Sequence, residues 1–293
     1  DGELEQRGGA SLALRSDLNG LGGAITVAEG ARLEVDPGQS LLLSGRNRLT
    51  VDGTLRARGG TIQVLSSLLS IRPASGSEER IGIGENAVLD ASGLAYTATD
   101  AWGRRYGTVL DGGEVVLGAE APEDFGDFNL YDTNNLFVVV REGALIDVSG
   151  ASADLDLGQA APTTVASDGG ALAMRSNSGI YFDGELRADA GGTNASGGGL
   201  EVLLEGTLTS LSQATEEASV LRNVILTQAD TGSGYDDENP AYGQARFSVD
   251  ALQDSGIDHL SLWARDAILF DGDVDLALGG SLSLTAVTLA TPD

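Results

Sequence analysis

The side chains that could do chemistry in this sequence are carboxylates, aromatic rings and a single histidine. The chain has 44 acidic residues, no cysteine, and 17 basic residues that are all arginine. Without cysteine there is no thiolate nucleophile and no disulfide, and without lysine there is no Schiff-base chemistry. His259 has no second histidine to form a zinc site with, so we expect a structural or solvent-exposed role for it.

Calcium is the one metal that the composition allows, because it binds carboxylates and backbone carbonyls. The best candidate ligands lie together in a glycine-rich stretch: Asp230, Asp236, Asp237 and Glu238. A second acidic group spans 123–127. Neither matches an EF-hand loop or the glycine-rich calcium repeat of β-rolls. The alternative is an ordinary solvated acidic loop, so we expect no cofactor, with calcium as the one possibility.

The aromatic residues suggest a binding role. They make up only 5% of the chain, yet many fall in stretches that interrupt its regular pattern. Aromatic rings beside acids and amides suit sugars and also anchor protein interfaces. The alternative is that the rings hold these loops against the body of the protein. The candidate ligand-binding residues are Tyr96, Trp102, Tyr106, Phe128, Tyr131, Tyr235 and Tyr242.

Catalysis is weighed as an alternative. Glycoside hydrolysis needs two carboxylates at a defined separation, and the sequence does not single out a pair. A lyase could use an arginine base, with Arg104, Arg105 and Arg175 as candidates, but no local signature supports one. No nucleophile motif of the G-x-S-x-G type surrounds any serine. We therefore expect a protein that is not an enzyme and has no catalytic residue.

The elements that must carry these side chains are short strands. Apolar residues alternate over about four positions, as in Leu41 and Leu43 or Ile62 and Val64, and turns such as Asp52-Gly53 and Gly59-Gly60 separate the runs. Alternation at period two predicts strands with one buried face. The spacing of the turns suits an all-β sandwich, a barrel or a coiled β-solenoid.

Internal repetition favours the solenoid. A unit of a turn, two spaced apolar residues and a glycine recurs at 51–60, 85–93, 142–150 and 182–191. A second unit follows each copy, beginning at Gly60, Gly113, Gly170 and Gly199. Stacked coils need such a repeat, because each coil buries its inner face against its neighbours. We expect one all-β domain over 1–293, a parallel β-helix with about ten to thirteen coils of roughly 20 residues. Insertions at 94–111, 119–135, 151–168 and 229–243 break the period, and 210–220 is a candidate short helix.

The coils at 51–67, 84–93, 141–150 and 182–206, with the block from Phe247 to Leu284, resemble the filamentous-haemagglutinin-like exoproteins of two-partner secretion in Gram-negative bacteria. The resemblance implies a right-handed parallel β-helix, export by a dedicated outer-membrane transporter, and a role in adhesion or biofilm. The asparagine-rich signature of the family's secretion domain is not seen in this sequence, so we expect an internal fragment of a longer protein.

The net charge of the chain makes some classes of binding partner unfavourable. A net charge of −27 repels nucleic acid and anionic lipid, and no apolar run approaches the length of a membrane helix. The resemblance to the two-partner-secretion exoproteins implies a secreted or cell-surface adhesin or biofilm-matrix module, and we expect one here. Its inserted loops would attach to a cell-surface glycan, an exopolysaccharide or a host receptor. The alternative is a carbohydrate-active β-helix enzyme, a polysaccharide lyase or hydrolase.

Overall fold

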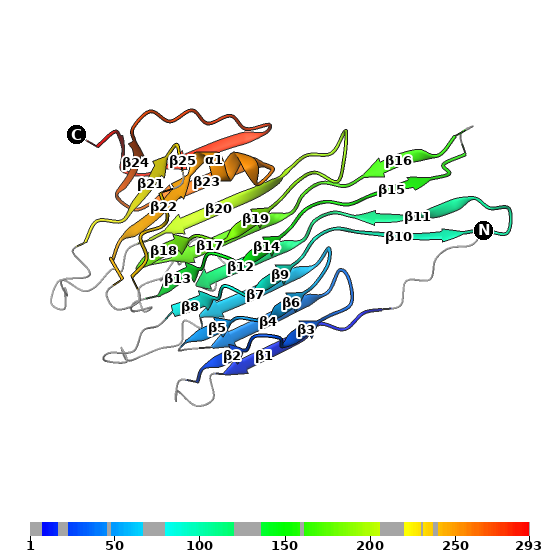
Figure 1. The fold of residues 1–293 in the computed structure, drawn as a ribbon, viewed down its shortest axis with the longest axis horizontal. Helices are drawn as coiled ribbons and strands as arrows, with labels where there is room; N and C mark the ends of the chain where they lie inside the picture. The colour runs from blue at the N-terminus through cyan, green and yellow to red at the C-terminus, as the bar shows by residue number, and fades with distance from the viewer. Residues whose placement is uncertain are drawn as a thin grey trace.

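The computed structural model describes residues 8–16, 23–45, 48–66, 80–119, 136–158, 161–205, 220–229, 231–236 and 240–292. This part of the chain contains twenty-six strands and one short helix (Figure 1). The predicted all-β class is therefore confirmed. Every strand pair in the three large sheets is parallel, and the two antiparallel pairs are separate hairpins.

The three parallel sheets are numbered here by the order in which the chain enters them. Sheet 1 contains, in spatial order, β1 (Leu12–Ser16), β4 (Ser40–Gly45), β7 (Thr61–Ser66), β12 (Glu114–Ala119), β17 (Ala171–Ser176), β20 (Gly198–Leu204), β23 (Ile257–Ala264) and β25 (Ser281–Thr285). Sheet 2 contains β2 (Ile25–Val27), β5 (Leu49–Val51), β8 (Arg80–Ile83), β13 (Phe137–Val140), β18 (Gly179–Phe182), β22 (Gln244–Ser248), β21 (Asn223–Thr227), β24 (Ala267–Asp271) and β26 (Thr288–Ala290). Sheet 3 contains β3 (Arg32–Glu34), β6 (Thr54–Arg56), β9 (Val88–Asp90), β14 (Leu145–Asp147) and β19 (Glu185–Arg187).

The register of sheet 3 confirms the repeat read from the sequence. Leu55 pairs with Leu89, Leu89 with Ile146, and Ile146 with Leu186, so the four aligned units stack in sequence order. These four side chains lie in the core. Small and branched apolar residues recur there because each level must fill the same narrow space between sheets.

Sheet 1 confirms the second unit with one correction. Ile62 pairs with Val115, and Val115 with Leu172. Leu172 pairs with Leu200, so Gly198 rather than Gly199 occupies the position of Gly170. The sequence reading was off by one because three glycines, Gly197 to Gly199, run together at this corner. In the described residues, sheet 1 has eight strands and sheet 2 has nine, fewer than the ten to thirteen coils that the sequence predicts.

Aspartates at the corners tie one level of the stack to the next. The Asp52 carboxylate accepts the Asn86 backbone N–H at 3.1 Å, and Asp168 accepts the Ser196 N–H at 2.7 Å. Asp258 accepts the Gly197 N–H at 2.6 Å. Corner aspartates therefore satisfy backbone donors that the short strands leave unpaired. Among described residues other than glycine, only Asn194 adopts a positive φ.

Within the described residues, the regular order of the strands changes after β20. β22 lies between β18 and β21, although β21 precedes it in the chain. Helix α1 (Val249–Asp254) then follows β22. Earlier in the chain, β2, β5, β8, β13 and β18 of sheet 2 are each followed by a strand of sheet 3. The block from Phe247 to Leu284 was expected to resemble the coils of a β-helix, and the helix departs from that expectation at this point. Ser248 caps the helix by accepting the Ala251 N–H, and Val249 and Leu252 bury its inner face. The helix considered at 210–220 lies almost wholly outside the described residues.

Candidate functional site

Two antiparallel hairpins project from one corner of the body and lie side by side (Figure 1). They are β10 (Leu94–Thr99) with β11 (Arg105–Leu110), and β15 (Ser152–Leu155) with β16 (Thr163–Ala166). Each is inserted between a strand of sheet 3 and the next strand of sheet 1, on successive levels. The insertions 94–111 and 151–168 thus leave the same corner, and we call the pair the arm.

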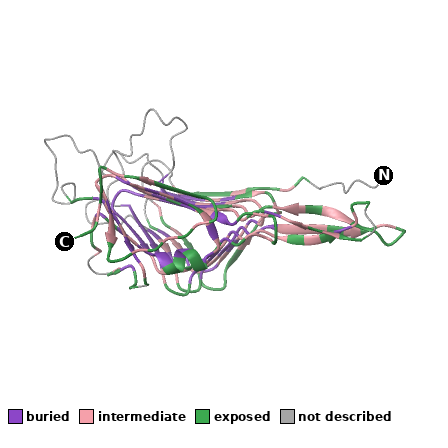
Figure 2. Ribbon diagram, turned by 90° about the horizontal axis from the view of Figure 1, so that it is seen from above, coloured by how far each residue is buried: buried purple, intermediate pink, exposed green. Residues whose placement is uncertain are grey.

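The ends of the two hairpins are hydrogen-bonded to each other. The Asp156 N–H donates to the Arg105 carbonyl at 2.7 Å, and the Arg105 N–H donates to the Asp156 carboxylate at 2.6 Å. Most arm residues are partly or fully exposed, whereas the buried residues gather between the sheets (Figure 2). Leu155 is an exception and is buried. The arm is therefore held by backbone pairing and by this end-to-end contact more than by a core.

Trp102 lies at the turn of the first hairpin and is 80% exposed. The Arg104 guanidinium lies 5.2 Å from the centre of the indole ring. Asp100 fixes this turn: one carboxylate oxygen accepts the N–H groups of Trp102 and Arg104, both at 2.9 Å, and the other accepts the Arg104 Nε at 2.7 Å. These bonds, led by the Arg104 N–H, lower the pKa of Asp100. The turn therefore presents a flat ring, a cation and an acid on a fixed backbone.

The other predicted residues of this insertion do not join Trp102. Tyr96 and Tyr106 are half-buried within the strands of the first hairpin. Burial, followed by the nearby charge of Asp36, raises the pKa of the Tyr96 phenol. These two rings belong to the arm's structure, and the exposed apolar residue of the second hairpin is Leu157, which the sequence did not single out.

Tyr235 and Tyr242 lie elsewhere, on the outer face of sheet 2. The Tyr242 ring meets Phe137 edge-on at 4.9 Å, and Tyr235 lies 4.9 Å from Tyr181. The Tyr181 hydroxyl donates to the Ala241 carbonyl. Burial, and next the neighbouring Tyr235, raises the pKa of Tyr181 to about 12. These rings hold residues 231–236 and 240–243 of the insertion 229–243 against the sheet, as the alternative interpretation of the aromatics expects.

The remaining predicted site residues receive no support. Phe128, Tyr131, Asp230, Asp237 and Glu238 lie outside the described residues, as does the acidic group at 123–127. Asp236 is exposed, and the described residues contain no group of three or more acidic or histidine side chains able to hold a metal. His259 is bonded through Nδ1 to the Ser281 hydroxyl at 2.9 Å.

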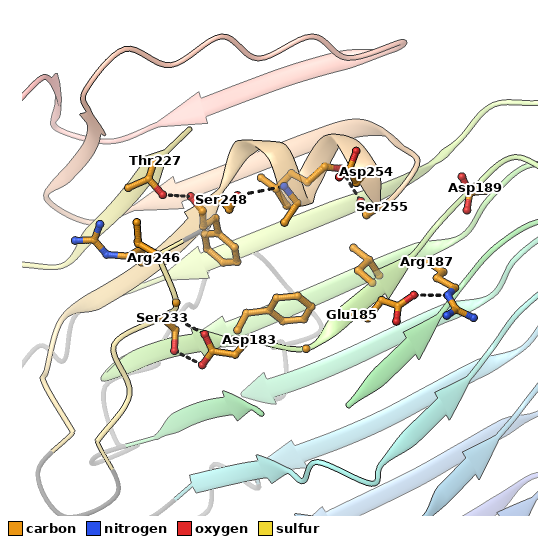
Figure 3. Close-up of a pocket in the computed structure, with 18 residues that line it drawn as sticks. Asp183, Glu185, Arg187, Asp189, Thr227, Ser233, Arg246, Ser248, Asp254 and Ser255 are labelled. Carbon is orange, nitrogen blue, oxygen red and sulfur yellow. Dashed lines mark hydrogen bonds and ion pairs between the residues drawn. The ribbon is translucent and has the colours of Figure 1, made fainter. Parts of the chain in front are cut away.

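A groove of about 390 Å³ lies between β19, α1 and the loop after β21 (Figure 3). Its apolar lining includes Phe182, Leu186, Phe247 and Leu252. The sequence analysis identified 182–206 only as a coil of the repeat, yet its first residues form one wall of the groove. What the sequence did not reveal is the helix at 249–254, which replaces a strand and leaves this space open.

Polar groups surround the groove. Asp183 accepts both the N–H and the hydroxyl of Ser233, and Glu185 pairs with Arg187 at 2.6 Å. Asp189 and Asp254 line the same groove, and Figure 3 draws no bond from either carboxylate to the other side chains of the lining. The groove therefore combines an apolar lining with carboxylates at its margin.

No family model, no curated protein and no solved structure matches this chain. Within the described residues, no helix is long and apolar enough to cross a membrane.

Proposed function

We propose that the three parallel sheets are the faces of a right-handed parallel β-helix. The chain visits sheets 1, 2 and 3 in turn through most levels, and equivalent positions on uninterrupted levels lie about 20 residues apart, as Leu41 and Ile62 do. Leu260 and Leu282 have nearly the same spacing. Right-handed connections between parallel strands are strongly preferred, which supports the proposed hand.

On this body we propose a secreted adhesin or biofilm-matrix module that attaches to glycans at the bacterial cell surface or in the matrix. The observation that carries the proposal is Trp102, whose ring is 80% exposed at the end of a projecting hairpin. Tryptophan is enriched at binding interfaces, because its ring combines a large apolar face with a hydrogen-bond donor. The earlier resemblance to two-partner-secretion exoproteins supports the same function and implies export by an outer-membrane transporter.

The chemistry of the arm's end suits a sugar. An indole face packs against the C–H face of a pyranose ring, while the Arg104 guanidinium and the Asp100 carboxylate offer a donor and an acceptor for hydroxyl groups. Because the whole chain carries a charge of −27, neutral or amino sugars are favoured over acidic polymers. A host receptor is the second kind of partner that the same ring could anchor.

The hydrogen bonds and ion pairs of the candidate catalytic side chains favour binding over catalysis. Among the candidate arginine bases, Arg104 is paired with Asp100 and Arg175 with Glu201. In the groove, Asp183 and Glu185 are bonded to Ser233 and Arg187. These pairings favour a module that binds without cleaving.

The test is binding of the purified chain to an array of neutral, amino and acidic glycans. Trp102→Ala should lose most of the signal, roughly tenfold or more if the ring is a central anchor. Val287→Ala removes an apolar side chain that is 85% exposed near the C-terminal end, and this control should bind as the original does. Equal loss in both variants, or no loss in Trp102→Ala, would contradict the proposed site. Depolymerisation of a bound polysaccharide would replace the adhesin by the enzyme alternative.

A further inference from the structure

Among the described residues, sheet 3 ends at β19, while sheets 1 and 2 continue beyond that strand. The chain after β22 forms α1 and returns at Ser255, whose carbonyl accepts the Ala188 N–H at 2.8 Å. A helix is about 10 Å wide, whereas strands in a sheet are about 4.8 Å apart. The axis of α1 therefore lies farther from β19 than a strand would, and the groove is the space that remains (Figure 3).

The backbone of β19 presents an unused edge to this groove. Glu185 N–H and the Arg187 carbonyl bond to the preceding level, at Ala144 and Val148, both at 2.8 Å. Because alternate residues of a parallel strand face opposite neighbours, the N–H and carbonyl of Leu186 point toward the groove. In the described part of the chain, β19 pairs with β14 alone. Such an edge is a template for an added strand.

We propose that this groove binds a short extended peptide, with a cationic side chain, that pairs with the edge of β19. Leu186 supplies one donor and one acceptor for the peptide backbone. Phe182, Phe247 and Leu252 supply an apolar surface for one of its side chains. Asp189 and Asp254 lie at the margin and complement a guanidinium or ammonium group. Strand addition of this kind takes affinity from main-chain bonds and specificity from side-chain pockets.

The occupant is a peptide rather than a sugar because the open feature is a strand edge. Ser255 already fills one end of the added-strand position by bonding Ala188, so the free edge spans only a few residues. The proposed site is separate from the arm and does not depend on the glycan-binding proposal. Loss of one activity therefore says nothing about the other.

The probe is a fluorescent capped pentapeptide with alternating arginine and valine, measured by anisotropy on the whole chain at moderate salt. Two companion peptides carry glutamate for arginine, or an N-methyl group at the central backbone nitrogen. Maltohexaose is the sugar competitor. We expect binding of the arginine peptide, and at least about tenfold weaker binding of both companions. Maltohexaose should not compete.

Variants on α1 separate the groove from general attraction to an acidic protein. Ala251 is exposed and lines the groove, so Ala251→Trp should fill it and weaken peptide binding about tenfold or more. Gln253→Trp places the same ring on the same helix at a residue outside the lining and should bind normally. Asp189→Asn with Asp254→Asn should weaken binding severalfold, whereas Glu29→Gln with Glu142→Gln should not.

A matched unfolding midpoint in all variants confirms that the fold is intact. Trp102→Ala should leave peptide binding unchanged. The proposal is overturned by absence of binding to the original chain. Equal affinity for the N-methylated peptide, equal loss in the two tryptophan variants, or displacement by maltohexaose would overturn it too.

Discussion

The body and the arm of this molecule are both made of strands, yet they are stabilised differently. In the body, parallel levels bury Leu, Ile, Val and Ala almost completely, and core positions such as Leu41, Leu89 and Leu117 are fully buried. In the arm, antiparallel hairpins pair mainly within themselves, and the largest ring is left in solvent. The body depends on stacking, and the arm on local hydrogen bonds. Substitutions on the arm should therefore have little effect on the free energy of unfolding of the body.

The largest expected effect is in the body. Leu117 lies in the middle of sheet 1, between Val64 and Met174, and is fully buried. Leu117→Ala should lower the free energy of unfolding by about 2–5 kcal/mol, because stacked neighbours cannot collapse into the cavity. Urea unfolding followed by circular dichroism measures it. Val109→Ala, at a half-buried position of the arm, is the control, and a similar loss there would remove the contrast between the two regions.

The second prediction concerns the ring cluster on the outer face of sheet 2. Tyr181→Phe removes the bond to the Ala241 carbonyl and should cost about 1 kcal/mol at neutral pH. The pKa of Tyr181 is raised from 10.0 to about 12, so its contribution is complete below pH 10 and is lost as the pH rises toward 12. The original chain should therefore lose stability over this window.

Urea midpoints on both sides of that window provide the measurement. The Phe variant should show a smaller decline, because it has no phenol to ionise at this position. Identical declines in the two proteins would show that Tyr181 ionises as freely in the fold as in the unfolded chain. Such a result would contradict the buried cluster and reopen the ring-bearing loop as a candidate binding surface.

The repeat made much of the body predictable from sequence. Leu55, Leu89, Ile146 and Leu186 occupy equivalent positions in four units, and they pair in that order. The repeat is visible because stacking imposes the same apolar spacing on every level. The helix after Phe247 was not predicted, because the apolar spacing of this block suits a short helix as well as strands. The Ser248 side chain caps the helix by accepting the Ala251 N–H. The groove could not be predicted, since it results from a strand that is missing.

The candidate site was predictable only in part, for a similar reason. Trp102 stands out by residue type within a polar insertion, and the structure leaves it exposed. The same reasoning selected Tyr235 and Tyr242, which pack on Phe137 and Tyr181. All three residues are aromatic and lie in insertions, so the sequence treats them alike. What separates them is whether the outer face of a neighbouring sheet carries rings that can pack against the loop. That depends on contacts between residues 54 positions apart (Tyr181 and Tyr235) and 105 positions apart (Phe137 and Tyr242).

The third prediction addresses the contact that joins the two hairpins. Asp156→Ala removes the carboxylate that accepts the Arg105 N–H at 2.6 Å. Since this bond is exposed, we expect a local loss near 1 kcal/mol, with severalfold faster amide exchange in β10, β11, β15 and β16. Protection in sheets 1 to 3 should be unchanged. Faster exchange spreading through the body would show that the arm and the body are one cooperative unit.

The smallest expected effect is at the turn that carries Trp102. The pKa of Asp100 is lowered from the ordinary value of an aspartate, because its carboxylate accepts the N–H groups of Arg104 and Trp102 and pairs with the Arg104 side chain. A group with a lowered pKa stabilises the fold above its unfolded-state pKa, and this contribution is lost as the pH falls through the lowered value. The turn should therefore loosen only in strong acid. A carboxyl carbon titration by NMR should give a midpoint below the ordinary pKa of an aspartate, with the Trp102 indole signal shifting in parallel.

Asp100→Asn keeps one acceptor oxygen but loses the charge, so Arg104 should leave the indole face while body stability is unchanged. A midpoint at or above the ordinary pKa of an aspartate, with an indole signal that does not change during the titration, would contradict this prediction. It would mean that the hydrogen bonds of the Asp100 carboxylate do not persist in solution. Ordering of the Trp102 ring would then require the bound ligand.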